Sequence, residues 1–261
     1  MRVLVTGSAG FIGCHTVVAL RERGDTVTGL DKKTGWDLSW KTPYPVEGYD
    51  AIVHHASSCS TPGSIVNPRG TFYDTVLSAA NILESARLGG TPIIVTSSVK
   101  ARDGMTPYGA AKRMVETWAT EYRNAYGIPV IINRPGTVYG PGQEGSEESG
   151  WIAWFCEAKR LGREVTIYGD GKQTRDLLHV DDYVALILAQ LDDIAAYDGG
   201  TFDVGGGKEN EVSVIEIVRH LGLRFHHEPK RYGDADRYVA LNDAPGWKPR
   251  IHWRESETLG R

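Results

Sequence analysis

The sequence predicts an α/β protein built on a doubly wound parallel sheet, with a smaller C-terminal region beside it. Three observations predict this class. Short apolar strands alternate with amphipathic helices over the first half of the chain. The glycine-rich run TGSAGFIG joins the first strand to the first helix. After about residue 140 the elements become shorter and the regular alternation stops.

The elements of the first half are delimited by capping and turn residues. Gly24 favours the end of the first helix. Thr106 followed by Pro107 favours the start of a long one. The stretch 31–50 is polar and rich in Pro, Gly and Trp, so we expect a loop. The expected strands are 2–6, 26–30, 51–54, 92–96 and 129–133, and the expected helices are 11–23, 72–87 and 107–126.

The second half predicts a smaller region that receives the substrate. We expect helices at 151–160, 181–191 and 213–221, and strands at 165–168 and 201–204. The predicted domains are therefore 1–140 for the sheet and 141–261 for the smaller region, with some later segments returning to the sheet.

Composition excludes several classes of protein. The net charge of −4 argues against nucleic acid as the main partner. No apolar run reaches the ~18 residues of a membrane span, and the N-terminus enters a strand without a signal peptide. The three cysteines, Cys14, Cys59 and Cys156, form neither a zinc pattern nor a disulfide framework. We therefore expect a soluble cytoplasmic protein with no metal site.

The glycine-rich run favours a dinucleotide-binding turn of the Rossmann type. Gly7 permits the tight turn, Gly10 allows the backbone to approach a pyrophosphate, and Gly13 lets the helix pack on the strand. The helix N-terminus then offers free N–H groups to the phosphate. The spacing is Gly-x-x-Gly-x-x-Gly rather than Gly-x-Gly-x-x-Gly, so a plain turn is the alternative.

Asp31 strengthens the cofactor hypothesis. It ends the second strand about 20 residues after the glycines, where an acid meets the adenosine ribose hydroxyls. Its charge would repel a 2′-phosphate and so favours NAD over NADP. Lys32 and Lys33, which follow directly, weaken that preference. The alternative is an ordinary acidic residue in a loop.

Tyr108 and Lys112 form a candidate acid–base pair. A spacing of four places both side chains on one helix face. A nearby ammonium favours the phenolate, and together with a cationic nicotinamide ring it would lower the tyrosine pKa toward 7. The phenolate then accepts a substrate hydroxyl proton while hydride leaves the same carbon. Ser98, at the end of the preceding strand, would orient that substrate oxygen. The alternative is an exposed helix pair.

With these residues in place, the sequence resembles the extended short-chain dehydrogenases/reductases, the family of nucleotide-sugar epimerases and dehydratases. The resemblance covers nearly the whole chain, through TGSAGFIG, DAIVHHAS, VTSSVK and PYGAAK in the first half and RPGTVYGPG and GDGKQTRDLLHVDD in the second. The last two runs are the most specific. Within the family, SGWIAWFC, GKQTRDLLH and PGWKP resemble the CDP-tyvelose (CDP-paratose) 2-epimerases.

The resemblance implies roles for the matching positions. Ser98, Tyr108 and Lys112 match the catalytic triad. Arg175 and Arg231 match the arginines that hold the diphosphate of the substrate, a role that suits the guanidinium fork. The implied cofactor-binding residues are Gly7, Gly10, Phe11, Ile12, Gly13, Asp31, Asp37, Leu38, His54, Ala56 and Ser57, together with Tyr108 and Lys112. The family also implies a homodimer that pairs through the helices at 72–87 and 107–126.

Several positions depart from the family pattern. Thr137 stands where the family has an asparagine that contacts the substrate diphosphate, and Thr75 replaces another asparagine. The stretch 31–50 lacks its usual helix, and the segment between Ser98 and Tyr108 is shortened. Both changes suggest a more open site and a different sugar. Trp151 is a further candidate for the substrate side, with core packing as the alternative.

The sequence thus predicts an NAD-dependent epimerase that acts on a nucleotide-diphosphate sugar through a transient keto sugar. The alternatives are an NAD(P)-dependent nucleotide-sugar reductase or dehydrogenase and a non-catalytic cofactor-binding regulator. A 4,6-dehydratase is disfavoured, because Val99 and Lys100 stand where those enzymes carry an Asp-Glu pair.

Overall fold

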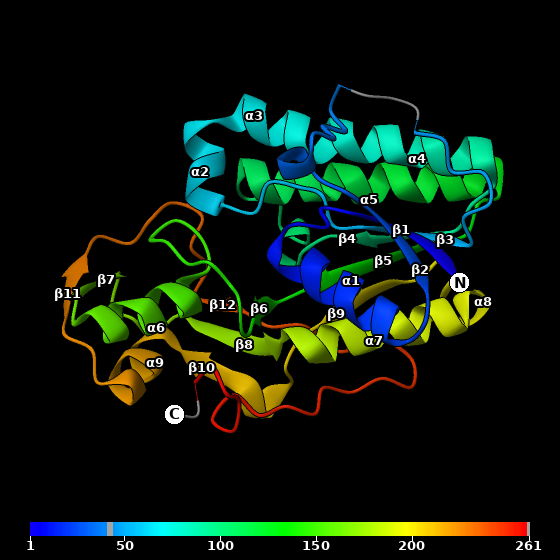
Figure 1. The fold of residues 1–261 in the computed structure, drawn as a ribbon. Coiled ribbons are helices and arrows are strands. Elements are labelled where there is room, and N and C mark those ends of the chain that lie inside the picture. The colour runs from blue at the N-terminus through cyan, green and yellow to red at the C-terminus, as the bar shows by residue number, and fades with distance from the viewer. Residues whose placement is uncertain (41–43, 260–261) are drawn as a thin grey trace.

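The computed structural model describes residues 1–40 and 44–259. Its centre is a six-stranded sheet in the order β2-β1-β3-β4-β5-β9 (Figure 1). Every strand pairing in this sheet is parallel, so the predicted doubly wound α/β class is confirmed. The strands are β1 (Arg2–Thr6), β2 (Thr26–Leu30), β3 (Ala51–His54), β4 (Ile93–Thr96), β5 (Val130–Pro135) and β9 (Thr201–Val204).

Helices cover both faces of the sheet. On one face they are α1 (Phe11–Glu22) and α7 (Val180–Asp192), and on the other α4 (Ser78–Gly89) and α5 (Pro107–Tyr126). The strands are buried on both sides, which explains why they read as continuous apolar runs.

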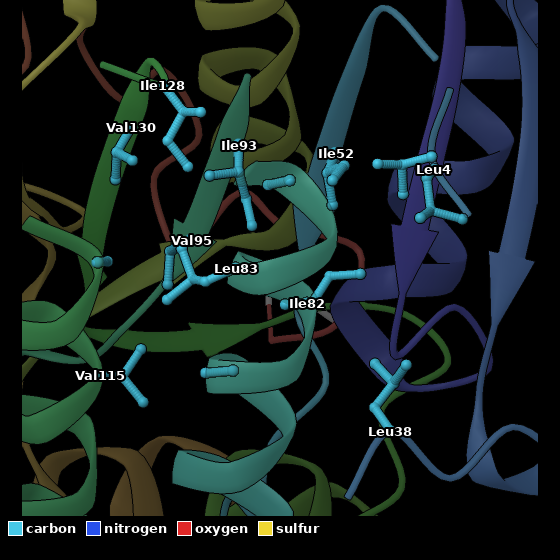
Figure 2. Packing of buried hydrophobic residues seen from close by; sticks show 14 of the residues in the cluster. Leu4, Leu38, Ile52, Ile82, Leu83, Ile93, Val95, Val115, Ile128 and Val130 are labelled. Carbon is cyan, nitrogen blue, oxygen red and sulfur yellow. The ribbon is translucent and has the colours of Figure 1, made fainter. Parts of the chain in front are cut away.

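Each face has its own apolar core. Leu83 of α4 packs with Ile52 and Ile93 of the sheet, and Figure 2 shows these side chains converging between the helix and the strands. On the opposite face Leu20 of α1 and Leu186 of α7 belong to a second cluster. The two cores hold the sheet rigidly, so the loops at its carboxyl edge are attached to a fixed platform.

The ends of α5 lie where the sequence predicts. The Thr106 hydroxyl accepts a hydrogen bond from the Gly109 backbone N–H at 3.2 Å, and Pro107 occupies the first turn. Gly127 ends the helix with φ of +72°, a conformation that glycine adopts without strain. The helix α1 ends at Glu22, one residue before its predicted end.

The helix predicted over 72–87 is longer and contains a π turn. It runs as α3 (Pro68–Phe72), a π segment (Tyr73–Leu77) and α4. The Asn67 side chain caps its start by accepting from the Gly70 N–H at 2.9 Å. Within the π segment the Thr75 hydroxyl accepts a hydrogen bond from the Ser58 N–H at 3.2 Å. The turn thereby fixes the loop that follows β3.

The second half forms a smaller region with its own core. Figure 1 shows it beside the carboxyl edge of the main sheet. Tyr139, Phe155 and Val218 are buried together there. The elements are β6 (Thr137–Tyr139), β8 (Thr174–His179), β10 (Glu211–Ser213) and β12 (Arg237–Tyr238) in one sheet, β7 (Val165–Tyr168) and β11 (Phe225–Glu228) in another, and α6 (Trp151–Leu161) and α9 (Val214–Leu221).

Several short elements were not predicted. They are α2 (Thr61–Val66), α8 (Ile194–Tyr197), β6, β8, β10, β11 and β12. Most span only a few residues, too few for a periodic pattern, and β8 reads TRDLLH without alternation. The predicted loop over 31–50 holds a short 3-10 helix (Lys32–Thr34), and its residues 41–43 lie outside the described residues.

The sheet domain is discontinuous in sequence. Strand β9 pairs with β5, and α7 packs on α1, although both come after residue 140. No helix of the described residues is long and apolar enough to cross a membrane.

The order of the strands creates a switch point in the main sheet. The chain from β1 passes to β2 on one side, while β3 lies on the other side of β1, so the connections diverge between β1 and β3. Ligands of doubly wound sheets bind at such a switch point.

Candidate active site

Two adjoining cavities open at the carboxyl edge of the sheet. The larger has a volume of about 440 Å³ and the smaller about 190 Å³. They share the lining residues Gly7, Gly10, His55 and Ser57, so they form one continuous cleft. The shared residues follow β1 and β3, which places the cleft at the switch point of the sheet.

The glycine turn leaves no room for side chains. A Cβ on Gly13 would lie 2.0 Å from the carbonyl oxygen of Gly7, and one on Gly7 would lie 2.7 Å from the backbone nitrogen of Ala56. Gly7 also has φ of +67°. The turn thus brings the start of α1 close to β1 and β3, as the sequence predicts for a pyrophosphate cradle.

The start of α1 suits an anion. Gly10 is the residue before the helix, Phe11 and Ile12 form its first turn, and all three line the larger cavity. The helix α1, which is described in full, has no acidic residue in that turn. Its free N–H groups and positive dipole end are therefore available to a phosphate.

The smaller cavity holds the predicted adenosine-side residues. It is lined by Asp31, Asp37, Leu38, Ala56 and Ser57, among others. The Asp31 carboxylate accepts hydrogen bonds from the Ala9 N–H at 3.1 Å and the Lys33 N–H at 2.8 Å. These bonds hold it against the glycine turn, where a ribose would lie.

Lys32, which weakened the predicted preference for NAD over NADP, forms ion pairs within the protein. The Lys32 ammonium pairs with Asp37 at 3.3 Å and also with Asp74. Burial acts against the charged form, but these two carboxylates raise the pKa of Lys32 overall. Because its charge is already compensated, Lys32 does not favour a 2′-phosphate over the ribose hydroxyls.

The structure places His54 away from both cavities. His54 is buried at 3% exposure, and its Nδ1 lies 2.7 Å from the Thr6 hydroxyl. It is not among the described residues that line the cleft. The next residue, His55, lines both cavities and bonds to Thr96 at 2.8 Å. The sequence predicted that His54 lines the cofactor site, and this was wrong by one residue, since His55 lines the cleft instead. The run HHAS does not show which of its two histidines faces the cleft, because that depends on how the chain turns after β3.

The predicted triad converges in the larger cavity. Ser98, Tyr108 and Lys112 all line it. The Lys112 ammonium donates to Ser57 Oγ at 2.9 Å and to the carbonyl of Thr96 at 2.8 Å. It lies 6.0 Å from the centroid of the Tyr108 ring. The lysine is therefore anchored between the tyrosine and the loop that the two cavities share.

Without the cofactor, the chain does not lower the pKa of Tyr108, and the expected lowering included a cationic nicotinamide ring. Burial raises the pKa of Tyr108 to about 12, while a hydrogen bond with Ser98 lowers it in part and Cys59 raises it. The Lys112 ammonium does not overcome this burial. Burial also lowers the pKa of Lys112 to about 8, against the opposing effects of Cys59 and Glu116. A cationic ring beside the phenol would supply the missing stabilisation of the phenolate.

The predicted substrate residues surround the same cavity. Thr137, Trp151, Arg175 and Arg231 all line it. The Arg175 guanidinium donates to the carbonyls of Thr174 at 2.7 Å and Ala235 at 3.1 Å. Trp151 packs edge-on against Phe155, with ring centroids 5.4 Å apart, so it contributes to both packing and lining.

Arg231 reaches the cavity from the last part of the chain. Its guanidinium donates to Asp234 at 3.1 Å and to the carbonyl of Glu147 at 3.2 Å, and lies 4.1 Å from the Tyr168 ring centroid. These contacts aim the arginine at the cavity and connect it to the loop before α6.

Sequence reasoning missed several lining residues. His55, Cys59, Lys100 and Asp234 were not assigned to the site, yet all line the cleft. Lys100 lies within the matched run VTSSVK, and Asp234 lies three residues after Arg231, so the sequence carried a usable signal for both. Cys59 had no such signal, since the loop after β3 is positioned by tertiary contacts such as Cys59 Sγ to Ser149 Oγ at 3.6 Å.

The segment between Ser98 and Tyr108 contacts the C-terminal part of the chain. The Tyr238 hydroxyl donates to Asp103 at 2.8 Å, and the Tyr232 hydroxyl donates to the carbonyl of Met105 at 3.0 Å. These two hydrogen bonds hold the segment between Ser98 and Tyr108 against the C-terminal part of the chain.

Known proteins that are similar to this chain over nearly its whole length are named as nucleotide-sugar epimerases. A "CDP-paratose 2-epimerase" from Salmonella typhi is 24% identical over 96% of this chain and 95% of that protein. A "Putative UDP-glucose 4-epimerase" from Methanocaldococcus jannaschii is 30% identical over 97% of this chain and 95% of that protein. The solved structure of a UDP-glucose 4-epimerase from Thermus thermophilus in complex with NAD is similar at a TM-score of 0.85 and 27% identity. That match covers 99% of this chain and 97% of the Thermus chain.

The family assignment follows from the length of the match as well as from the site. The model of the NAD dependent epimerase/dehydratase family matches residues 3–205, which include the glycine turn, the triad and Arg175. The glycine cradle and the Ser98, Tyr108 and Lys112 cluster fit the cofactor that this family uses. The chain therefore belongs to the NAD-dependent epimerase/dehydratase family.

Proposed function

We propose that this chain is an NAD-dependent epimerase of a nucleotide-diphosphate sugar, working through a transient keto sugar. The observation that carries the proposal is a single cleft. Ser98, Tyr108 and Lys112 line it beside the glycine turn, and Arg175 and Arg231 line it farther along. An acid–base group, a cofactor cradle and two cations for a diphosphate thus lie within reach of one substrate.

The cofactor-binding part of the cleft would hold NAD along its length. The start of α1 would bind the pyrophosphate, and the Asp31 carboxylate would accept hydrogen bonds from the ribose hydroxyls of the adenosine. Lys112 would lie at the nicotinamide end. When bound, NAD supplies the acceptor and later the donor of the hydride.

Proton transfer is the task of Tyr108. Its phenolate oxygen takes the proton from the substrate hydroxyl as the carbon is oxidised, and returns it when the hydride comes back to the other face. Ser98, which bonds to Tyr108, orients the substrate oxygen. Lys112, fixed by Ser57 and by the Thr96 carbonyl, favours the phenolate electrostatically.

Substrate binding is the task of the smaller region. Arg175 and Arg231 would hold the diphosphate through charge-assisted hydrogen bonds. Thr137 and Trp151 would line the sugar nucleotide. The domain division at residue 140 follows this distribution of roles, with β9 and α7 returning to the sheet. Relatives named for UDP-glucose and CDP-paratose support a nucleotide sugar as the substrate class.

Identification of the nucleotide released on denaturation tests the function. We expect stoichiometric NAD or NADH by mass spectrometry, because an epimerase regenerates its cofactor in each turnover. Incubation with UDP- and CDP-sugars should then give inverted product without added cofactor. An empty protein that consumes NAD(P)H with such sugars would instead be a reductase or dehydrogenase. An empty protein with no turnover would be a regulator.

We also propose that the enzyme is a homodimer that pairs through α4 and α5. These helices pack together and expose Leu88, Met114, Trp118 and Tyr126 on their outer side. Large apolar side chains exposed on a pair of packed helices are typical of an interface. The free thiols Cys14, Cys59 and Cys156 support a reducing compartment, the cytoplasm.

The change Trp118→Glu should convert the dimer to a monomer, because it buries a charge in the interface. Light scattering coupled to size exclusion gives the mass. The change Leu241→Glu, at an exposed leucine outside α4 and α5, is the matched control and should leave the mass unchanged. A dimeric Trp118→Glu protein would exclude this surface as the interface.

A further inference from the structure

Lys100 is a cation that the catalytic scheme does not use. It lines the larger cavity together with Arg175 and Arg231. Its backbone N–H donates to the Ser98 hydroxyl oxygen at 3.3 Å, which places Lys100 beside a residue of the triad. Lys100 therefore lies on the reacting side of the cavity, and its charge faces the same space as the two arginines.

The Lys100 ammonium has unused hydrogen-bonding capacity. It donates to the Thr61 hydroxyl at 2.6 Å and lies 5.4 Å from the centroid of the Tyr238 ring. An ammonium carries three N–H donors. Among the described residues no carboxylate lies within ion-pairing distance of it, whereas Arg231 is paired with Asp234. Lys100 thus presents free donors to the cavity.

The surroundings of Lys100 leave its charge poorly compensated. Burial, together with the nearby guanidinium groups of Arg175 and Arg231, lowers its pKa to about 8. Asp234 and Asp103 act in the opposite direction without restoring the usual value. A partly buried cation beside two others is favourable only when an anion shares the cavity.

We propose that Lys100 binds an anionic oxygen of the nucleotide-sugar substrate, next to the phosphates held by Arg175 and Arg231. The inference rests on the proposed function and extends it to a third cation. That anionic oxygen belongs either to the diphosphate or to a carboxylate on the sugar. Lys100 is a positioning residue, since it acts by holding the substrate and transfers no proton.

Ligand binding to the NAD-loaded protein tests the role of Lys100. Calorimetric titrations would use inorganic pyrophosphate, UDP, CDP, UDP-glucose and UDP-glucuronate. We expect Lys100→Met to weaken binding about tenfold, because it removes a charge-assisted hydrogen bond. Lys100→Arg should stay within about threefold of wild type. Lys208→Met, at an exposed lysine outside the cleft, should bind as wild type does.

The pattern of losses identifies the anion. If Lys100→Met loses affinity equally for UDP, CDP or pyrophosphate and for the nucleotide sugars, Lys100 binds the diphosphate. If it loses affinity for UDP-glucuronate alone, Lys100 binds a carboxylate on the sugar. Wild-type affinity of Lys100→Met for every probe that wild type binds would overturn the proposal. If wild type binds none of the probes, the proposed function itself is contradicted.

The pH profile separates a charge effect from a structural one. The Lys100 amine attracts anions strongly only when it is protonated. The affinity of wild type should therefore fall as pH rises through about 8, the pKa of Lys100 in the protein without substrate. Lys100→Arg should keep its affinity over that range, since guanidinium stays charged. A fall of equal size in Lys100→Arg would assign the titration to another group and overturn the charge argument.

Discussion

Replacing Tyr108 by phenylalanine should reduce turnover by about a thousandfold and leave NAD binding intact. The phenol oxygen is the group placed to move the substrate proton, and removal of a general acid–base group typically costs 10²–10⁴-fold. Phenylalanine keeps the ring and its packing beside Lys112. The measurement is turnover of the nucleotide sugar that wild type converts, together with the NAD content of the purified protein.

A second tyrosine of α5 provides the control for this change. Tyr126 is exposed near the end of the helix, away from the cleft, so Tyr126→Phe makes the same substitution without touching the site. Its turnover and NAD content should match wild type. A Tyr108→Phe enzyme with full activity would show that another group moves the proton, and the mechanism would have to be assigned anew.

Replacing Gly13 by alanine should abolish retention of NAD. The added Cβ would lie 2.0 Å from the Gly7 oxygen and 2.7 Å from the Gly7 carbonyl carbon. Both are backbone atoms, so no rotation relieves the contact, and α1 must move away from the turn. We expect loss of NAD on desalting and destabilisation of about 1–3 kcal/mol, the usual range for overpacking.

The next residue of the same helix is the matched control. Cys14 is exposed, and Cys14→Ala introduces the same methyl side chain one position later. Cofactor content by absorbance after denaturation, and melting temperature, should both stay at wild-type values for this variant. If Gly13→Ala retained NAD and melted as wild type does, the close packing of α1 on the glycine turn would be refuted.

The amino-acid sequence alone determined the sheet domain and most of the cleft. The apolar runs of β1 to β5 and the capping signals around α5 are local, so their positions could be predicted to within a few residues. The triad was predictable for the same reason, because Tyr108 and Lys112 are neighbours on one helix. Motif runs located Arg175 and Arg231, whose convergence depends on the fold.

Only the tertiary structure decided which side chains face the cleft. His55 rather than His54 lines it because the chain turns at the end of β3, where the Ser58 N–H bonds to Thr75 in the π segment. Lys100 and Cys59 enter the cleft through contacts with Thr61 and Ser149, residues distant in sequence. The pKa of Tyr108 likewise depends on burial, which arises only in the folded chain. Periodicity and spacing record local geometry, whereas orientation at a loop and desolvation are properties of the packed molecule.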